Sequence, residues 1–109
     1  MQLFNSNHLK DIPALYDQEN KGNRAKVYLR VYIPNLGYEW LITEYDKEQE
    51  LFFGFASLND PDMAELGYIS KIEIEDLSDK YRISVENIQM NLINAKAKYI
   101  FKNIRELDS

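Results

Sequence analysis

The sequence contains no cysteine, one histidine and no long hydrophobic run. Without cysteine the chain forms neither disulfides nor thiolate metal sites, which is consistent with a reducing compartment. His8 alone cannot build a histidine-based triad or a site with several histidine ligands, so we expect a surface or helix-capping role for it. No segment approaches the roughly 20 apolar residues of a membrane span, and the first ten residues do not resemble a signal peptide. We therefore expect a cytoplasmic protein that does not contact membranes.

The motifs that mark common enzyme classes are also missing. The chain has no phosphate-binding glycine loop, no G-x-G-x-x-G, no H-E-x-x-H and no G-x-S-x-G. The DPD sequence at residues 60–62 does not follow the spacing of a calcium-binding loop, and a turn explains it better than a cation site. We therefore expect no cofactor and no metal ion.

The composition indicates one small globular domain over residues 1–109, with 45% hydrophobic and 13% aromatic residues. The net charge of −5 is unevenly distributed. Residues 1–79 hold fifteen acidic and seven basic residues, whereas residues 80–109 hold three acidic and six basic ones. An acidic body repels nucleic acid and attracts basic partners, although solubility alone is the simpler explanation.

Four segments have the composition of β-strands, at residues 26–33, 38–46, 50–57 and 65–70. Two of them alternate apolar and polar positions, and short links between the first three favour antiparallel hairpins. In the second segment we expect Trp40, Ile42 and Glu44 to share a face. In the fourth segment, ELGYIS, Leu66 and Tyr68 share a face, and Gly67 would allow a neighbouring element to approach closely.

Three helices are expected. The first covers residues 7–20, with Ser6 or Asn7 as its cap and a kink or a late start caused by Pro13. The second follows the capping-box pattern of Ser70 and Glu73 and runs to Leu77, with Ile72 and Ile74 partly buried. The third is a long C-terminal helix over residues 84–107 with two apolar stripes. Its second stripe either packs on the sheet or meets a partner, including another copy of this chain.

The expected fold is therefore α+β. It has an antiparallel sheet of three to four strands, an N-terminal helix, a short helix after the last strand and the long C-terminal helix.

Three groups of side chains are candidates for function. Exposed aromatic and acidic residues suit protein binding, and these are Tyr28, Tyr32, Glu39, Asp46, Glu48, Asp60 and Asp62. Carboxylates that converge would suit a small, metal-assisted enzyme, and these are Glu19, Glu44 and Glu65. A basic stripe on the last helix would suit phosphate contacts, through Lys98, Lys102 and Arg105.

Each group also has a structural explanation. Glu44 would pair with Arg30 across strands, and the long helix would cover Tyr28 and Tyr32. The basic stripe would complement the dipole at a helix C-terminus. Glu65 would be scaffold if it had a partner, whereas an unpaired Glu65 beside Glu44 would favour the enzyme.

Four short motifs occur in order along the chain: IPALYDQE (12–19), WLITE (40–44), FFGF (52–55) and ELGYIS (65–70), the last followed by a Glu-rich helix. Over residues 9–77 this order resembles a family of short bacterial proteins classed as a domain of unknown function. One small departure is Gln18, where other members often have small residues. The resemblance brings no catalytic residues, but it implies carriage on plasmids, conjugative elements and phages.

The first hypothesis is therefore a non-enzymatic, acidic accessory protein of a mobile element. Proteins of that setting often block host defence enzymes, so we expect an anti-CRISPR or anti-restriction inhibitor that binds a basic, nucleic-acid-binding host protein. The alternatives are the carboxylate-dependent enzyme and a nucleic-acid-binding module using the basic stripe.

Overall fold

The computed structural model describes residues 3–101. Within that range the chain forms five strands, three α-helices and two 3-10 turns. The strands are β1 (Lys26–Ile33), β2 (Tyr38–Asp46), β3 (Leu51–Leu58), β4 (Glu65–Ser70) and β5 (Ser84–Asn91). The helices are α1 (Ser6–Leu9), α2 (Lys71–Leu77) and α3 (Leu92–Tyr99), and the turns are η1 (Gly22–Arg24) and η2 (Pro61–Met63).

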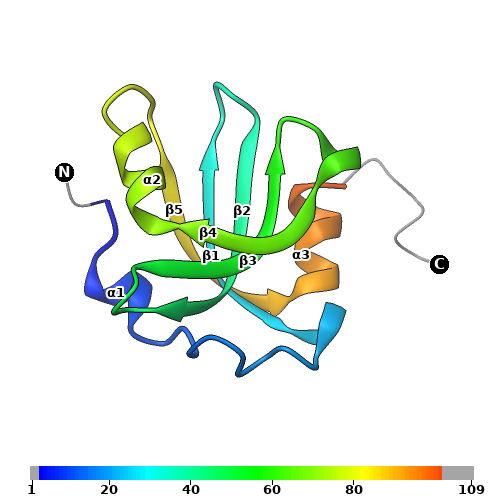
Figure 1. Cartoon of the computed structure of the whole chain (residues 1–109). Helices are drawn as coiled ribbons and strands as arrows, with labels where there is room; N and C mark the ends of the chain where they lie inside the picture. Colours follow the sequence, from blue (N-terminus) through cyan, green and yellow to red (C-terminus); the bar gives the residue numbers. More distant parts are fainter. Residues whose placement is uncertain (1–2, 102–109) are drawn as a thin grey trace.

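All five strands belong to one antiparallel sheet in the order β4-β3-β2-β1-β5. The sheet is strongly curved, so that β4 crosses in front of β1 and β2 (Figure 1). Helices α1 and α2 lie on one side of the molecule, and α3 lies on the other. The predicted α+β class and the four predicted strands are confirmed, with β3 displaced by one residue.

The predicted long C-terminal helix is wrong. Residues 84–91 instead form β5, which pairs with β1, and only Leu92–Tyr99 is helical. The apolar residues that gave a helical pattern are thus divided between two elements: Ile88 lies in β5, whereas Leu92 and Ala95 belong to α3 and are buried. Strand pairing is a long-range interaction and overrides a local helical pattern of this kind.

The N-terminal helix is also shorter than predicted. Helix α1 has four residues, and its cap is Asn5, whose side chain accepts a hydrogen bond from the His8 backbone N–H at 3.0 Å. His8 Nδ1 accepts from the Asn5 N–H in return, which confirms its capping role. Beyond α1 the chain passes alongside β2, where the Pro13 carbonyl accepts from the Tyr45 N–H at 2.9 Å. Proline is disfavoured in the interior of a helix, and it also disfavours the helical conformation at the residue before it. Pro13 therefore accounts for the early end of α1.

The buried hydrophobic residues form two separate clusters. Leu29, Ile42 and Phe52 belong to the larger one, which Phe4, Ile12 and Ile74 cover. In the smaller one, Leu92 and Ala95 of α3 pack with Val27, Leu41 and Phe55 of the sheet.

A bulge in β2 changes which face Glu44 occupies. The register against β3 shifts between Ile42 and Glu44, so that β2 has one extra residue there. As a result Glu44 pairs with Phe53, while Tyr45 packs on the larger cluster that contains Trp40 and Ile42. The prediction that Glu44 shares a face with Trp40 and Ile42 is therefore wrong.

The helix after β4 matches its prediction. Ser70 caps α2 by accepting from the Glu73 N–H at 3.2 Å, and the helix ends at Leu77. Ile74 is buried, but Ile72 is exposed rather than partly buried. Lys71 is buried as well, and its ammonium group donates to Glu50 at 3.0 Å and to Glu75 at 3.4 Å.

Close backbone approach occurs at Gly54, not at Gly67. A Cβ on Gly54 would lie 2.1 Å from the Leu41 carbonyl oxygen, so β2 and β3 can meet there only without a side chain. Gly67 is the partner of Gly54 on β4, and a Cβ on it would meet nothing within 4 Å. The expectation that Gly67 admits a neighbouring element is wrong, and open space lies beside it instead.

Candidate functional site

The exposed large hydrophobic side chains are concentrated around β4. In the part of the chain that the structure describes they are Tyr16, Leu58, Met63, Leu66, Tyr68 and Ile72. Five of the six lie between residues 58 and 72, and the sixth, Tyr16, has its hydroxyl 3.0 Å from that of Tyr68. Single exposed apolar residues are ordinary on a protein surface, but a cluster of them calls for an explanation.

The same segment holds the excess negative charge. Residues 60–76 contain six acidic residues and one basic residue, which leaves twelve of each in the rest of the chain. Five of those acidic residues are exposed: Asp60, Asp62, Glu65, Glu73 and Asp76. The single base, Lys71, is buried and paired with Glu50 and Glu75. We call these five carboxylates and the six exposed hydrophobic residues the β4 surface.

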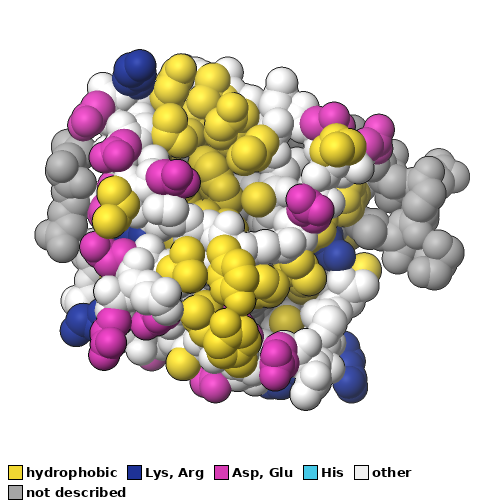
Figure 2. Space-filling view, in the orientation of Figure 1, with side chains coloured by type: hydrophobic (Ala, Val, Ile, Leu, Met, Phe, Trp, Pro, Cys, Tyr) yellow, Lys and Arg dark blue, Asp and Glu magenta, His cyan; other side chains and the backbone are white. Residues whose placement is uncertain are grey.

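Figure 2 looks at the side of the molecule that β4 crosses. Hydrophobic side chains gather over the centre of this face, and acidic side chains lie around them (Figure 2). Apolar contact area with charged residues at its border is the usual layout of a protein interface.

A buried carboxylate holds Tyr16 in place at this surface. Glu44 is 3% exposed, and its two oxygens accept from the backbone N–H groups of Tyr16 at 2.9 Å and Gln18 at 2.7 Å. The Gln18 side chain adds bonds to the Lys26 backbone and to the Thr43 carbonyl. Tyr16 itself has a φ of 75°, an uncommon backbone conformation for a non-glycine residue that these bonds maintain.

Tyr68 of β4 connects the segment around Tyr16 to the sheet. It pairs with Phe53 across β3 and β4, and the two rings meet edge to face with centroids 5.4 Å apart. The hydrogen bond with Tyr16 raises the pKa of the Tyr68 phenol above its usual value, and the nearby carboxylates of Glu44 and Glu19 add to the effect. The two tyrosines, 59% and 56% exposed, therefore stand as a fixed pair.

Below this pair is a cavity of about 240 Å³, whose lining includes Glu19, Glu44, Phe53 and Leu92. Two of the three carboxylates of the enzyme alternative thus share a cavity, but Glu65 does not line it. Both oxygens of Glu44 already accept backbone hydrogen bonds, which favours a structural role for that residue. Within residues 3–101 no group of three or more acidic or histidine side chains is arranged to hold a metal ion.

Three predicted protein-binding residues lie elsewhere, in or beside an ion-pair network on β1. The Arg30 guanidinium pairs with Glu39 and Glu86. Its Cζ atom lies 3.6 Å from the ring centroid of Tyr32 and 4.1 Å from that of Tyr99. Burial opposes the charge of Arg30, but the hydrogen bonds to the two carboxylates prevail and raise its pKa. Tyr32 and Glu39 therefore serve this network, and Arg30 pairs with Glu39 and not, as predicted, with Glu44. Tyr28 is half-buried, with the Lys26 ammonium 5.2 Å from its ring.

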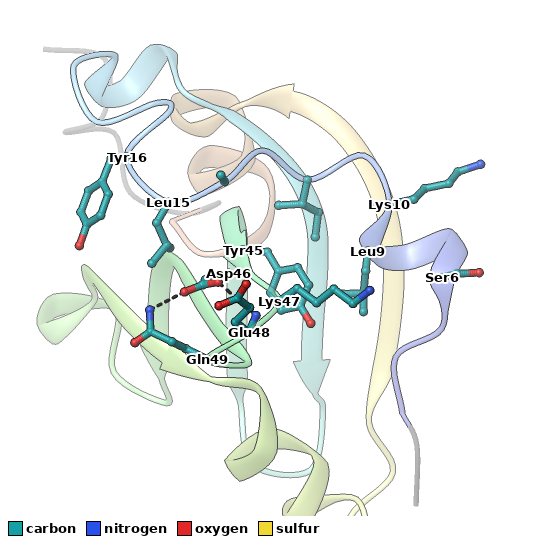
Figure 3. A pocket seen from close by; sticks show the side chains of 12 residues that line it. Ser6, Leu9, Lys10, Leu15, Tyr16, Tyr45, Asp46, Lys47, Glu48 and Gln49 are labelled. Carbon is teal, nitrogen blue, oxygen red and sulfur yellow. Dashed lines mark hydrogen bonds between the residues drawn. The ribbon is translucent and has the colours of Figure 1, made fainter.

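Two further candidates, Asp46 and Glu48, lie at the β2–β3 hairpin. With Leu9, Leu15 and Tyr45 they line a groove of about 850 Å³ between this hairpin and the N-terminal segment (Figure 3). The Asp46 carboxylate accepts from the Gln49 side chain and from the Glu48 backbone N–H, which stabilises the hairpin turn.

Only Asp60 and Asp62 of the seven predicted residues belong to the β4 surface. Asp60 accepts from the Asp62 N–H at 3.1 Å, so the pair shapes η2, as the turn explanation predicts. Sequence reasoning missed Tyr16, Leu66 and Tyr68 as surface residues. The alternation of ELGYIS placed Leu66 and Tyr68 on one face, but not on an exposed one.

The basic stripe is described only in part. Lys98 is exposed on α3, with its ammonium 5.3 Å from the Tyr99 ring. Lys102 and Arg105 lie outside the described residues, as does the end of the predicted second apolar stripe. No helix in the described range has the length and apolar content needed to cross a membrane.

Comparison with known proteins gives one match. The model of a family described as protein of unknown function (DUF2958) matches residues 9–98. That range contains every element from β1 to β5 and most of α3. No curated protein and no solved structure matches.

Proposed function

Because the chain belongs to the DUF2958 family, whose description assigns no function, we propose its function from the β4 surface: a non-enzymatic protein that binds a basic partner protein. The proposal rests on one observation: the exposed hydrophobic residues and the excess of acidic residues occur in the same part of the molecule. The exposed hydrophobic residues and the net negative charge of the chain both lie at residues 58–76 and the adjoining Tyr16.

The two features have different physical roles. Tyr16, Leu66 and Tyr68 offer apolar area, and the hydrogen bond between the tyrosines fixes them before any partner arrives. A fixed surface loses little conformational freedom on binding. The surrounding carboxylates attract a basic partner over distance and fix its orientation, an effect that weakens as salt is added.

The finer proposal is that the partner is a nucleic-acid-binding protein and that the chain inhibits it. A surface that binds nucleic acid is rich in lysine and arginine, so an acidic protein that occupies it competes with the nucleic acid. An inhibitor of a defence enzyme on a mobile element fits this scheme, with the sequence resemblance as its support.

The test compares capture of partners by matched variants. The full chain is immobilised and exposed to a nuclease-treated lysate of the bacterium that carries the gene, at low and at high ionic strength. Glu65→Lys reverses a charge on the β4 surface, and Glu48→Lys makes the same change on the β2–β3 hairpin. Tyr68→Ser removes an aromatic ring from the surface without changing the charge.

We expect the unmodified chain and Glu48→Lys to capture the same basic protein, and Glu65→Lys and Tyr68→Ser to lose it. Binding of the purified partner should weaken as salt is added and should compete with nucleic acid. The absence of a basic partner at low ionic strength, or equal capture by all four proteins, would overturn the proposal.

A further inference from the structure

We infer that the partner contacts this chain through an extended segment that pairs with the free edge of β4 as a sixth strand, with basic residues alternating with apolar ones. This inference rests on the proposed function and specifies its binding mode. It follows from three properties of β4: an unpaired edge, the lack of protection of that edge, and the order of its side chains.

The edge of β4 differs from the edge at the other end of the sheet. All six residues of β4 pair with β3 on one side, and no strand within residues 3–101 pairs with its other side. The other edge strand, β5, lies against α1, and the Asn87 side chain donates to the Asn7 carbonyl at 2.9 Å. An unpaired strand edge presents a row of backbone donors and acceptors that a second chain can use.

Proteins usually protect such an edge with proline, lysine or a bulge. The sequence of β4, ELGYIS, contains neither proline nor lysine. Its pairing with β3 runs without a register shift from Leu51–Ser70 to Ala56–Glu65, whereas the β1–β5 and β2–β3 pairs are both irregular. Strand β4 is therefore regular and open to pairing, and Glu65 is its only charged residue.

The side chains of β4 indicate what an added strand would carry. Leu66 and Tyr68 lie on one face beside Tyr16 and suit β-branched or other apolar neighbours. Glu65 and Gly67 lie on the other face. A basic residue fits opposite Glu65, and an aromatic ring fits over the open space beside Gly67, since such a ring can cover an edge glycine.

Charge decides between a foreign segment and a second copy of this chain. Pairing of two β4 edges would bring together two segments of residues 60–76, each with six acidic residues and one buried base. Like charges facing each other across strands destabilise the pair. A basic segment instead finds five exposed carboxylates around the edge.

The experiment uses the full chain and a synthetic probe. The probe is a capped peptide in which valine alternates with lysine, and in which the central lysine is replaced by tyrosine. Binding is measured by fluorescence anisotropy. Two further forms are N-methylated on alternate amides: one on the odd-numbered amides of the peptide and the other on the even-numbered amides. In a strand, alternate amides point to opposite edges, so one form blocks pairing with β4 and the other leaves it intact.

We expect the unmodified peptide to bind, one N-methylated form to lose at least about tenfold in affinity and the other to bind as before. Backbone amides of residues 65–70 should gain protection from hydrogen exchange. A peptide with glutamate in place of lysine should not bind, and Glu65→Lys should weaken binding more than Glu48→Lys does.

Equal binding of both N-methylated forms would overturn strand pairing while leaving an acidic, protein-binding surface in place. Concentration-dependent dimerisation of the chain through β4 would also overturn the inference, because the occupant would then be a second copy. If no peptide binds but the basic partner is captured in the Glu65-dependent manner described above, the proposed function stands and the binding mode is wrong.

Discussion

The interior of the sheet and its β4 edge use the same kinds of residue in opposite ways. On β2, carboxylates face cations or backbone donors: Glu39 pairs with Arg30 of β1, which also binds Glu86 of β5, and Glu44 accepts from two N–H groups. Aromatic rings there stack on the guanidinium. Around β4, five carboxylates and two tyrosine rings are exposed, and the one nearby base is paired with Glu50 and Glu75.

This contrast separates acidic residues that stabilise the fold from those of the proposed binding surface. A buried carboxylate is retained only where hydrogen bonds or a cation compensate for its lost hydration. An exposed carboxylate surrounded by others of the same sign contributes little to folding and weakens it through repulsion. Its concentration in one segment, together with apolar side chains, is better explained by recognition than by stability.

The largest expected difference concerns the paired glycines of β3 and β4. Gly54→Ala places a methyl group 2.1 Å from the Leu41 carbonyl oxygen, so the strands must separate. We expect a loss of about 3 kcal/mol in the free energy of unfolding, measured by urea denaturation. Gly67→Ala enters open space and should change stability by no more than about 0.5 kcal/mol. Equal effects of the two changes would show that β4 is as closely packed as the interior.

A smaller difference is expected from one substitution made at two glutamates. Glu44→Gln turns an oxygen that accepts from the backbone into an NH₂ group that cannot accept, so we expect a loss of about 2 kcal/mol in the free energy of unfolding. Glu65→Gln, on the exposed strand, should leave stability unchanged within about 0.5 kcal/mol. A stable Glu44→Gln protein would remove the structural role of Glu44 and favour the enzyme alternative.

Much of the fold could be predicted because its signals are local. The alternation in β1, the limits of β4 and the Ser70 cap of α2 depend on neighbouring residues, and the structure confirms each. The β5 segment could not be predicted in this way. Its pairing with β1 joins residues more than fifty positions apart, and its apolar residues also fit a helical period.

The site was less predictable than the fold because exposure depends on strand order. The pattern of ELGYIS places Leu66 and Tyr68 on one face, but only the position of β4 at the end of the sheet leaves that face exposed. The bulge in β2 had a similar effect on Glu44, since one extra residue moves it to the other face. Neither fact has a local signal in the sequence.

The smallest expected effect is the alkaline titration of the tyrosine pair. The Tyr16 hydrogen bond raises the pKa of Tyr68, and burial raises that of Tyr45, so two of the eight tyrosines should ionise above the usual value near 10. A raised phenol pKa favours the neutral form in the folded state. Its contribution to stability is therefore complete below pH 10 and is lost as the pH rises through the folded-state pKa.

Tyr68→Phe should remove one of these two late ionisations from the ultraviolet titration of phenolate, while Tyr68→Ser should do the same and also abolish partner binding. Tyr68→Phe keeps the ring contact with Phe53, so its stability at neutral pH should stay close to that of the unmodified chain, whereas Tyr68→Ser loses this contact and should be somewhat less stable. If the ionisation that Tyr68→Phe removes is instead one near pH 10, the two hydroxyls do not bond in solution. Tyr16 would then be held by Glu44 alone. The β4 surface would not be fixed before a partner binds, as the proposed function requires.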